Sequence, residues 1–167
     1  SAFRSAGQRC SALRLLCLHE SIAAGVIDMV AGAMAELHVG PAAKLATDVG
    51  PLIDAQAHAH IARHVERLHR SARLLAASPR GAAGAHHQVP IAFEIGRVED
   101  LTEEVFGPVL HVVRWSGEVD ALLDRINALG YGLTLGVQTR IDSRALRIAE
   151  RARVGNVYIN RNMIGAV

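Results

Sequence analysis

The sequence is poor in the residues that mark several classes of protein. Its 167 residues include two cysteines, too few for a disulfide framework, and their spacing is not that of a zinc or redox motif. Only 4% of the residues are aromatic, and the net charge is +2. The basic residues are scattered and form no stripe with interleaved aromatics, so nucleic acid is not expected as a partner.

Long apolar runs are also missing. The most apolar stretch, from Ser21 to Leu37, is interrupted by Asp28 and Glu36. It is also shorter than the roughly 20 residues that a membrane span needs. The first residues lack the basic region and apolar run of a secretory signal. We therefore expect a soluble protein without a membrane span, located by default in the cytoplasm.

What is present is a globular pattern in which strands and helices alternate. Half of the residues are apolar and 20% are charged, a composition that suits one domain with a core. Short apolar runs predict strands at 13–18, 73–77, 89–95, 109–113, 133–139 and 155–160. Periodic patterns predict helices at 21–37, 55–70, 118–129 and 143–153. This alternation predicts an α/β protein with a mostly parallel sheet.

Single residues indicate where these elements begin and end. Ser21, Asp54 and Ser116 are predicted to cap three of the helices. Gly130 stands where a helix end requires a left-handed residue. Pro90 predicts that the strand at 89–95 lies at an edge of the sheet, because proline cannot donate a ladder hydrogen bond.

Cys10 is a candidate nucleophile. It follows Gly7 in a turn before the first expected strand, where the thiol would be exposed. A reactive thiol needs positive surroundings or nearby backbone N–H groups, and Arg9 is its neighbour in sequence. The alternative is an inert, half-buried thiol, which is the better description of Cys17 in the middle of an apolar run.

Glu103, Glu104 and Phe106 form a second candidate group, followed by Gly107 and Pro108. A carboxylate can accept both hydroxyls of a ribose, and a phenylalanine can pack against the nicotinamide side of a dinucleotide. The alternative is a solvated acidic pair with the phenylalanine in the core.

Histidines offer a third candidate. His60 and His64 are four residues apart on an expected helix, a spacing that can hold a metal. No cysteine or acidic residue is obviously arranged to complete the site. We expect these histidines to be solvated on an arginine-rich face and expect no metal site, while keeping the metal as an alternative.

The amino-acid sequence resembles that of a known family over its whole length. The stretches that carry the resemblance are Gly7-Gln-Arg-Cys-Ser-Ala12, Glu103-Glu-Val-Phe-Gly-Pro108, Gly132-Leu-Thr-Leu-Gly-Val-Gln-Thr-Arg-Ile-Asp142 and Gly155-Asn-Val-Tyr-Ile-Asn-Arg-Asn162. They resemble the NAD(P)-dependent aldehyde dehydrogenases. Within that family, they are most similar to the L-glutamate-γ-semialdehyde (1-pyrroline-5-carboxylate) dehydrogenase module of the bifunctional proline utilisation enzymes.

The resemblance implies a role for each candidate residue. Cys10 would be the nucleophile that attacks the aldehyde and forms a thioester. Glu104 and Phe106 would bind NAD, and Arg9 and Ser11 would hold the carboxylate of the substrate. Asn160 and Asn162 would be structural hydrogen-bonding residues.

The resemblance also implies the domain organisation. Residues 1–167 would be an incomplete, cysteine-bearing catalytic domain with a three-layer αβα fold, without the cofactor-binding domain. The family's general-base glutamate and oxyanion-hole asparagine precede the cysteine motif, so we expect the chain alone to be inactive. FAD would belong only to the proline dehydrogenase module of the parent enzyme. The parent is expected to be a homodimer, and a non-catalytic assembly module or another branch of the family remain alternatives.

Overall fold

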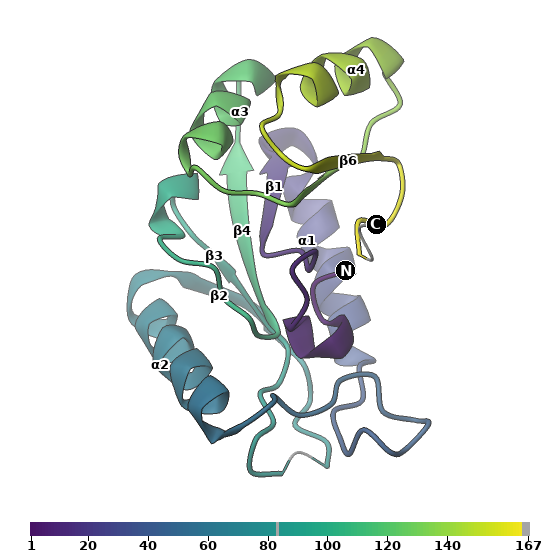
Figure 1. Cartoon of the computed structure of the whole chain (residues 1–167), viewed down its shortest axis with the longest axis vertical. Coiled ribbons are helices and arrows are strands. Elements are labelled where there is room, and N and C mark those ends of the chain that lie inside the picture. The colour runs from purple at the N-terminus through teal and green to yellow at the C-terminus, as the bar shows by residue number, and fades with distance from the viewer. Residues whose placement is uncertain (83, 165–167) are drawn as a thin grey trace.

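The computed structural model describes residues 1–82 and 84–164, which form a twisted main sheet with helices on both faces (Figure 1). The main sheet has the strand order β1-β4-β3-β2. Its strands are β1 (Leu15–His19), β2 (Arg73–Ala77), β3 (Ile91–Glu94) and β4 (Val109–Trp115). The β1–β4 and β3–β4 pairs are parallel and β2–β3 is antiparallel. A second sheet pairs β5 (Thr134–Val137) with β6 (Asn156–Ile159) in parallel, so the expected mostly parallel α/β fold is confirmed.

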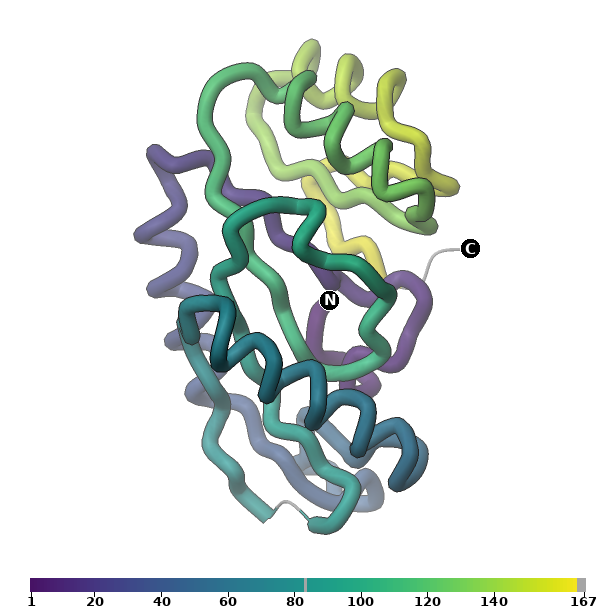
Figure 2. Tube along the Cα trace, turned by 90° about the vertical axis from the view of Figure 1, so that its left-hand side faces the viewer, coloured from purple at the N-terminus to yellow at the C-terminus, as the bar shows by residue number. Residues whose placement is uncertain are grey.

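The main sheet separates two apolar cores, which makes the fold three-layered. Helix α1 (Glu20–Ala35) covers one face, and α2 (Ala55–Ser71) covers the other (Figures 1 and 2). Alternate residues of β4 point to opposite faces. Val109 and Val113 belong to the core beneath α2, whereas Leu110 and Val112 belong to the core beneath α1.

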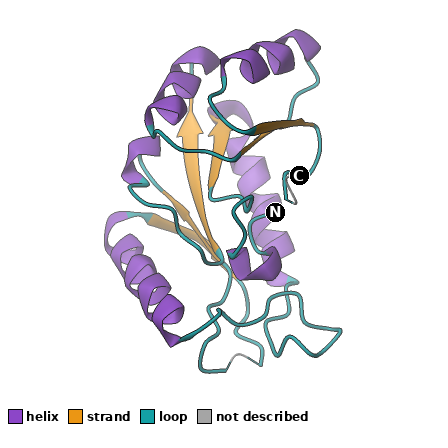
Figure 3. Ribbon diagram, viewed as in Figure 1, coloured by secondary structure: helices purple, strands orange, loops and turns teal. Residues whose placement is uncertain are grey.

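Helices α3 (Val119–Ala128) and α4 (Asp142–Arg151) lie together at the end of the molecule that carries the small sheet (Figure 3). Leu123 of α3 and Ile148 of α4 share a core with Val137 of β5. Ion pairs between the two helices, such as Arg151 with Asp124, add to this packing.

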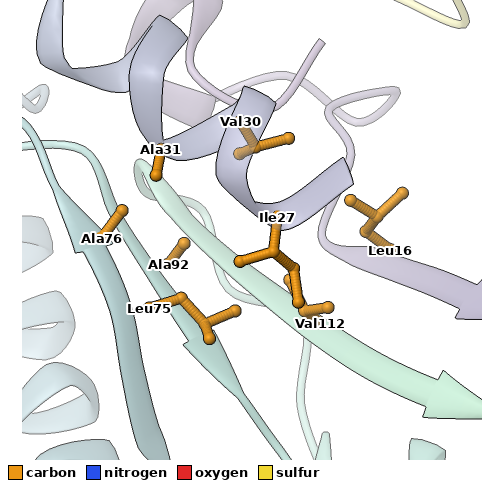
Figure 4. A pocket seen from close by; sticks show the side chains of 8 residues that line it. All are labelled: Leu16, Ile27, Val30, Ala31, Leu75, Ala76, Ala92 and Val112. Atoms are coloured by element: carbon orange, nitrogen blue, oxygen red, sulfur yellow. The ribbon is translucent and has the colours of Figure 1, made fainter. Parts of the chain in front are cut away.

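The space beneath α1 is tightly filled (Figure 4). The side chains around it are all apolar: Leu16, Ile27, Val30, Ala31, Leu75, Ala76, Ala92 and Val112. The remaining gap holds about 10 Å³, too little for a ligand. This face of the sheet therefore serves packing rather than binding.

Two of the predicted helix starts are wrong and one is confirmed. Asp54 Oδ1 accepts the Ala57 N–H at 2.7 Å and caps α2 as expected. At α1 the cap is His19, whose ring accepts the Ser21 N–H, so Ser21 lies inside the helix. Helix α3 begins after Glu118 rather than at Ser116.

The prediction of an edge strand at Pro90 is also wrong. Strand β3 lies inside the sheet between β4 and β2. It begins at Ile91, so Pro90 precedes the strand and needs no ladder N–H. Gly130, in contrast, has the predicted left-handed conformation, with φ of 78° just after α3.

Candidate active site

The strand register explains why Cys10 and Phe106 lie at the same end of the sheet. In the parallel pair β1–β4, Leu15 is paired with His111. Five residues back from each partner are Cys10 (15 − 5) and Phe106 (111 − 5). Because parallel strands enter the sheet from the same edge, the two segments converge there.

The segment before Cys10 is a tight left-handed turn. Ser5 and Ala6 have φ of 53° and Gly7 has φ of 68°. Non-glycine residues seldom adopt this conformation, and such strain tends to occur at functional sites. The turn continues through Cys10, where the Ala12 N–H donates to the Arg9 carbonyl at 3.0 Å, and the Cys10 side chain is exposed.

Two glycines let the converging segments and helix α2 pack closely together. A Cβ at Gly7 would lie 2.1 Å from the Gly107 carbonyl oxygen. A Cβ at Gly107 would lie 2.6 Å from the side chain of Ile61 on α2. The Cys10 turn therefore lies directly on the segment of Phe106, which itself lies on α2.

Arg14 connects these two segments, and the sequence patterns did not identify it. Its side chain is only 10% exposed. One terminal nitrogen donates to the Gly7 carbonyl and the other to the Arg9 carbonyl, both at 2.9 Å. Its guanidinium lies 4.6 Å from the centre of the Phe106 ring. The available signal was an arginine inside an apolar run, a position that a charged residue seldom occupies without partners.

The charges around Arg14 place Cys10 and Glu104 in one electrostatic neighbourhood. Burial lowers the pKa of Arg14, and the negative charge of Glu104 opposes this change. The nearest oxygen of Glu104 is 3.8 Å from Arg14 Nη2. Tyr131, from the loop before β5, has its pKa raised by burial and then by Glu104.

Glu104 and Phe106 are both open to solvent beside this arginine. The Glu104 side chain is 42% exposed. Phe106 is also 42% exposed, although Val105 and Gly107 on either side of it are buried. The exposed ring and the exposed carboxylate therefore both lie beside the arginine that holds the Cys10 turn.

The residues that flank Cys10 differ in exposure. Arg9 is exposed, and its Nε donates to Ser5 Oγ at 3.0 Å. Ser11 is 2% exposed. Of the two residues predicted to hold a substrate carboxylate, Arg9 is the one that solvent can reach.

Cys17 lies in β1, among the residues packed against the core beneath α2. Burial raises the pKa of its thiol to about 12. Since the thiolate is the reactive form, Cys17 is expected to be unreactive at neutral pH, in contrast to the exposed Cys10.

The two asparagines make structural hydrogen bonds. Asn160 has φ of 53°, and its amide accepts the Thr139 N–H and donates to the Thr139 carbonyl. This contact closes the end of the β5–β6 pair. Asn162 accepts the Ser1 hydroxyl and the Ile164 N–H, both at 2.8 Å, so it links the first residue described to the last.

The histidines do not have the arrangement expected from the sequence. His60 is partly exposed, with Nε2 3.9 Å from Glu103. His64, expected to be solvated, is 3% exposed and its Nε2 lies 2.8 Å from Nε2 of the buried His111. Within residues 1–82 and 84–164, no group of three or more histidine, cysteine or acidic residues could hold a metal ion.

None of the helices in the described part of the chain is long and apolar enough to cross a membrane. The site lies in a three-layer α/β fold, with an exposed thiol, a carboxylate and an aromatic ring at the edge of the sheet where β1 and β4 begin.

Comparison with known proteins identifies the family. The family model described as "Aldehyde dehydrogenase family" matches residues 1–167. The chain is 48% identical to the "Bifunctional protein PutA" of Klebsiella aerogenes over 175 residues, covering 100% of the chain and 13% of that protein. It is 31% identical to the "1-pyrroline-5-carboxylate dehydrogenase" of Geobacillus kaustophilus over 169 residues, covering 100% of the chain and 33% of that protein.

A solved structure shows the same backbone arrangement. A crystal structure of a proline utilization A (PutA) mutant from Bradyrhizobium japonicum superposes with a TM-score of 0.95 at 52% identity, covering 100% of this chain and 17% of that one. The chain belongs to the aldehyde dehydrogenase family. It spans about an eighth of the length of the PutA relatives and a third of that of the 1-pyrroline-5-carboxylate dehydrogenases.

Proposed function

We propose that this chain is the cysteine-bearing part of an NAD-dependent dehydrogenase that oxidises L-glutamate-γ-semialdehyde to glutamate in proline catabolism. The observation that carries the proposal is the convergence of Cys10 with Glu104 and Phe106 around Arg14. The similarity to PutA and to 1-pyrroline-5-carboxylate dehydrogenases supports the choice of aldehyde.

Cys10 is the proposed nucleophile. Its thiolate adds to the aldehyde carbon, and the carbonyl oxygen becomes an oxyanion that the Cys10 backbone N–H helps to stabilise. Loss of a hydride then leaves an acyl group on the Cys10 sulfur as a thioester, and water releases glutamate from it. Arg14 donates hydrogen bonds to the Gly7 and Arg9 carbonyls and so holds the backbone of the Cys10 turn. The Cys10 sulfur is therefore positioned before the substrate binds.

Glu104 and Phe106 are the proposed residues for the nicotinamide half of NAD. The exposed carboxylate of Glu104 can accept the two ribose hydroxyls, and the exposed ring of Phe106 can pack beside the nicotinamide. Bound NAD⁺ would supply the acceptor for the hydride. Arg14 lies on Phe106 and near Glu104, so it positions both relative to the thiol.

Arg9 is the proposed direct contact for the substrate carboxylate, and Ser11 is proposed to support it from within the same turn. An exposed guanidinium suits a carboxylate because it can donate two parallel hydrogen bonds. The buried Ser11 would act only from behind the turn. The parent is proposed to be a cytoplasmic homodimer.

The reactivity of Cys10 tests the proposal in the chain itself. Alkylation by a small reagent, followed by mass spectrometry, should label Cys10 much faster than Cys17. The semialdehyde should slow the labelling of Cys10 by occupying the thiol. A Cys10 that labels no faster than Cys17 and at a rate that the semialdehyde does not change would overturn the assignment.

A chimera tests the complete reaction. Residues 1–167 replace the matching segment of a PutA relative, and reduction of NAD⁺ with semialdehyde is followed. The chimera should be active, and the same chimera with Cys10→Ser should lose activity while still folding. Activity that survives Cys10→Ser would disprove the role of the thiol.

A further inference from the structure

Two buried histidines lie behind the proposed site. His64 on α2 is 3% exposed and His111 on β4 is 1% exposed. His111 belongs to the same face of β4 as Val109 and Val113, so it points toward α2. The proposed reaction uses neither residue, and a buried polar pair of this kind needs a complete set of partners.

The partners of the pair determine the direction of every hydrogen bond. His111 Nδ1 lies 2.9 Å from the Arg14 carbonyl, which can only accept, so Nδ1 carries the proton. Arg67 Nη2 lies 2.7 Å from His64 Nδ1 and can only donate, so His64 Nδ1 is unprotonated. The 2.8 Å contact between the two Nε2 atoms then requires His64 to donate to His111. Both rings are therefore neutral.

The hydrogen bonds of the two histidines are linked to the proposed site by an ion pair and by the backbone. Arg67 also donates to Glu103 Oε1 at 3.2 Å. Glu103 is followed in sequence by Glu104, whose Oε1 lies 3.8 Å from Arg14 Nη2. The circuit thus runs from the Arg14 carbonyl through the two histidines, Arg67 and the acidic pair back to the Arg14 side chain.

We propose that His64 and His111 are positioning residues for the Cys10 site. Through the Arg14 carbonyl they hold the segment that carries Cys10, and through Arg67 they hold the segment that carries Glu104 and Phe106. Their role in catalysis rests on the function proposed above, whereas their role in holding the two segments can be measured without it.

The circuit works only while both histidines are neutral. A second proton on either ring would place a hydrogen-bond donor where the circuit needs an acceptor. The charged groups that face the pair are Arg67 and Glu103 at the α2 side and Arg14 at the β1 side, with His60 one turn away on α2. Burial, the neighbouring histidine and Arg67 lower the pKa of His64 to about 4, and burial lowers that of His111.

Nitrogen NMR of the chain with labelled histidines tests the circuit directly, because it reports which ring nitrogen carries the proton. At neutral pH, His64 should be protonated only at Nε2 and His111 only at Nδ1, and His64 should still be neutral at pH 6. Titration of either ring near the ordinary histidine pKa of about 6.5, or the opposite tautomers, would overturn the proposal.

Amide hydrogen exchange tests the consequence for the site. The reporters are the Ala12 N–H in the Cys10 turn and the Gly107 N–H, which donates to the Val105 carbonyl at 3.1 Å. His64→Leu should speed exchange at both by about 2- to 10-fold, the effect of losing one hydrogen bond of ordinary net strength. His111→Leu should do the same, and the double variant should add little, since either change breaks the same chain.

Leu68→Ala is the matched control. Leu68 is buried on α2 one turn beyond His64, and its substitution removes no hydrogen bond of the circuit. It should destabilise the protein without this selective effect at Ala12 and Gly107. Additive effects of the two histidines, or a change at only one reporter, would contradict the proposal. If the leucine variants do not fold, acidification of the wild type must open both reporters together as His64 gains its proton.

The outcomes separate this inference from the proposed function. If the semialdehyde does not change the labelling of Cys10 but both reporters respond to His64→Leu, the circuit holds the segments and the enzymatic role is wrong. If Cys10 responds and the reporters do not, the function stands and the histidines only fill the core.

Discussion

Gly7 offers the most direct test of how the Cys10 turn is built. Its φ of 68° is left-handed, and a Cβ there would lie 2.1 Å from the Gly107 oxygen and 2.5 Å from its carbonyl carbon. These are backbone atoms in the segment that carries Phe106, so they cannot rotate out of the way. Gly7→Ala must therefore either separate the two segments or distort both.

The size of the effect follows from two separate costs. An alanine in a left-handed conformation costs about 1–2 kcal/mol. Forcing an extra carbon into a filled space costs typically about 1–3 kcal/mol more. We therefore expect Gly7→Ala to lower the free energy of unfolding by about 2–5 kcal/mol.

Gly117 provides a control that isolates the first cost. Its φ is also left-handed, at 80°, and among the described residues no heavy atom lies within 4 Å of a Cβ built there. Gly117→Ala should therefore lose only the conformational cost of about 1–2 kcal/mol. The difference between the two variants measures the contact between the two site segments.

Urea unfolding and the alkylation rate of Cys10 are the assays. Gly7→Ala should show the larger loss of stability and a changed labelling rate at Cys10, whereas Gly117→Ala should label like the wild type. Equal losses in the two variants, with unchanged labelling, would refute the close packing of the segments.

Three further predictions use the same assays. The pKa of His64 is about 4 in the folded chain and about 6.5 in the unfolded chain. Between these two pH values the unfolded chain binds a proton at His64 that the folded chain does not bind. The free energy of unfolding, measured by urea titration, should be constant above pH 6.5 and decrease by about 3 kcal/mol as the pH is lowered to 4. In His64→Leu this decrease should be smaller. Cys17 should stay unlabelled at pH 7 and react only when the chain unfolds, since its pKa is about 12. Arg14→Lys should cost about 1.5–3 kcal/mol and speed exchange of the Ala12 amide, because an ammonium cannot reproduce the two-carbonyl fork; wild-type values would contradict this.

Much of the secondary structure could be predicted because its causes are local. The apolar periodicity of α2, its Asp54 cap and the left-handed Gly130 all depend on residues within a few positions. Pro90 misled the prediction because the edge of a sheet is defined by which strand lies alongside. Strand β3 has β4 on one side and β2 on the other, and the residues around Pro90 do not reveal these pairings.

The site divides in the same way. Cys10, Glu104 and Phe106 were identified from the sequence because the stretches around them are distinctive. Arg14 was missed since its meaning comes from the two carbonyls and the ring that it contacts. His64 was assigned to solvent because its polar partner, His111, lies on another element.

The sequence by itself determined the family, the order of the elements and the exposed thiol turn, because these depend on local patterns and on distinctive sequence motifs. Only the tertiary structure decided how the Cys10 and Phe106 segments are held together. The β1–β4 register aligns the segments, Gly7 lets their backbones touch, and Arg14 contacts both of them. Such contacts join residues that are far apart in the chain, and local sequence patterns carry no record of them.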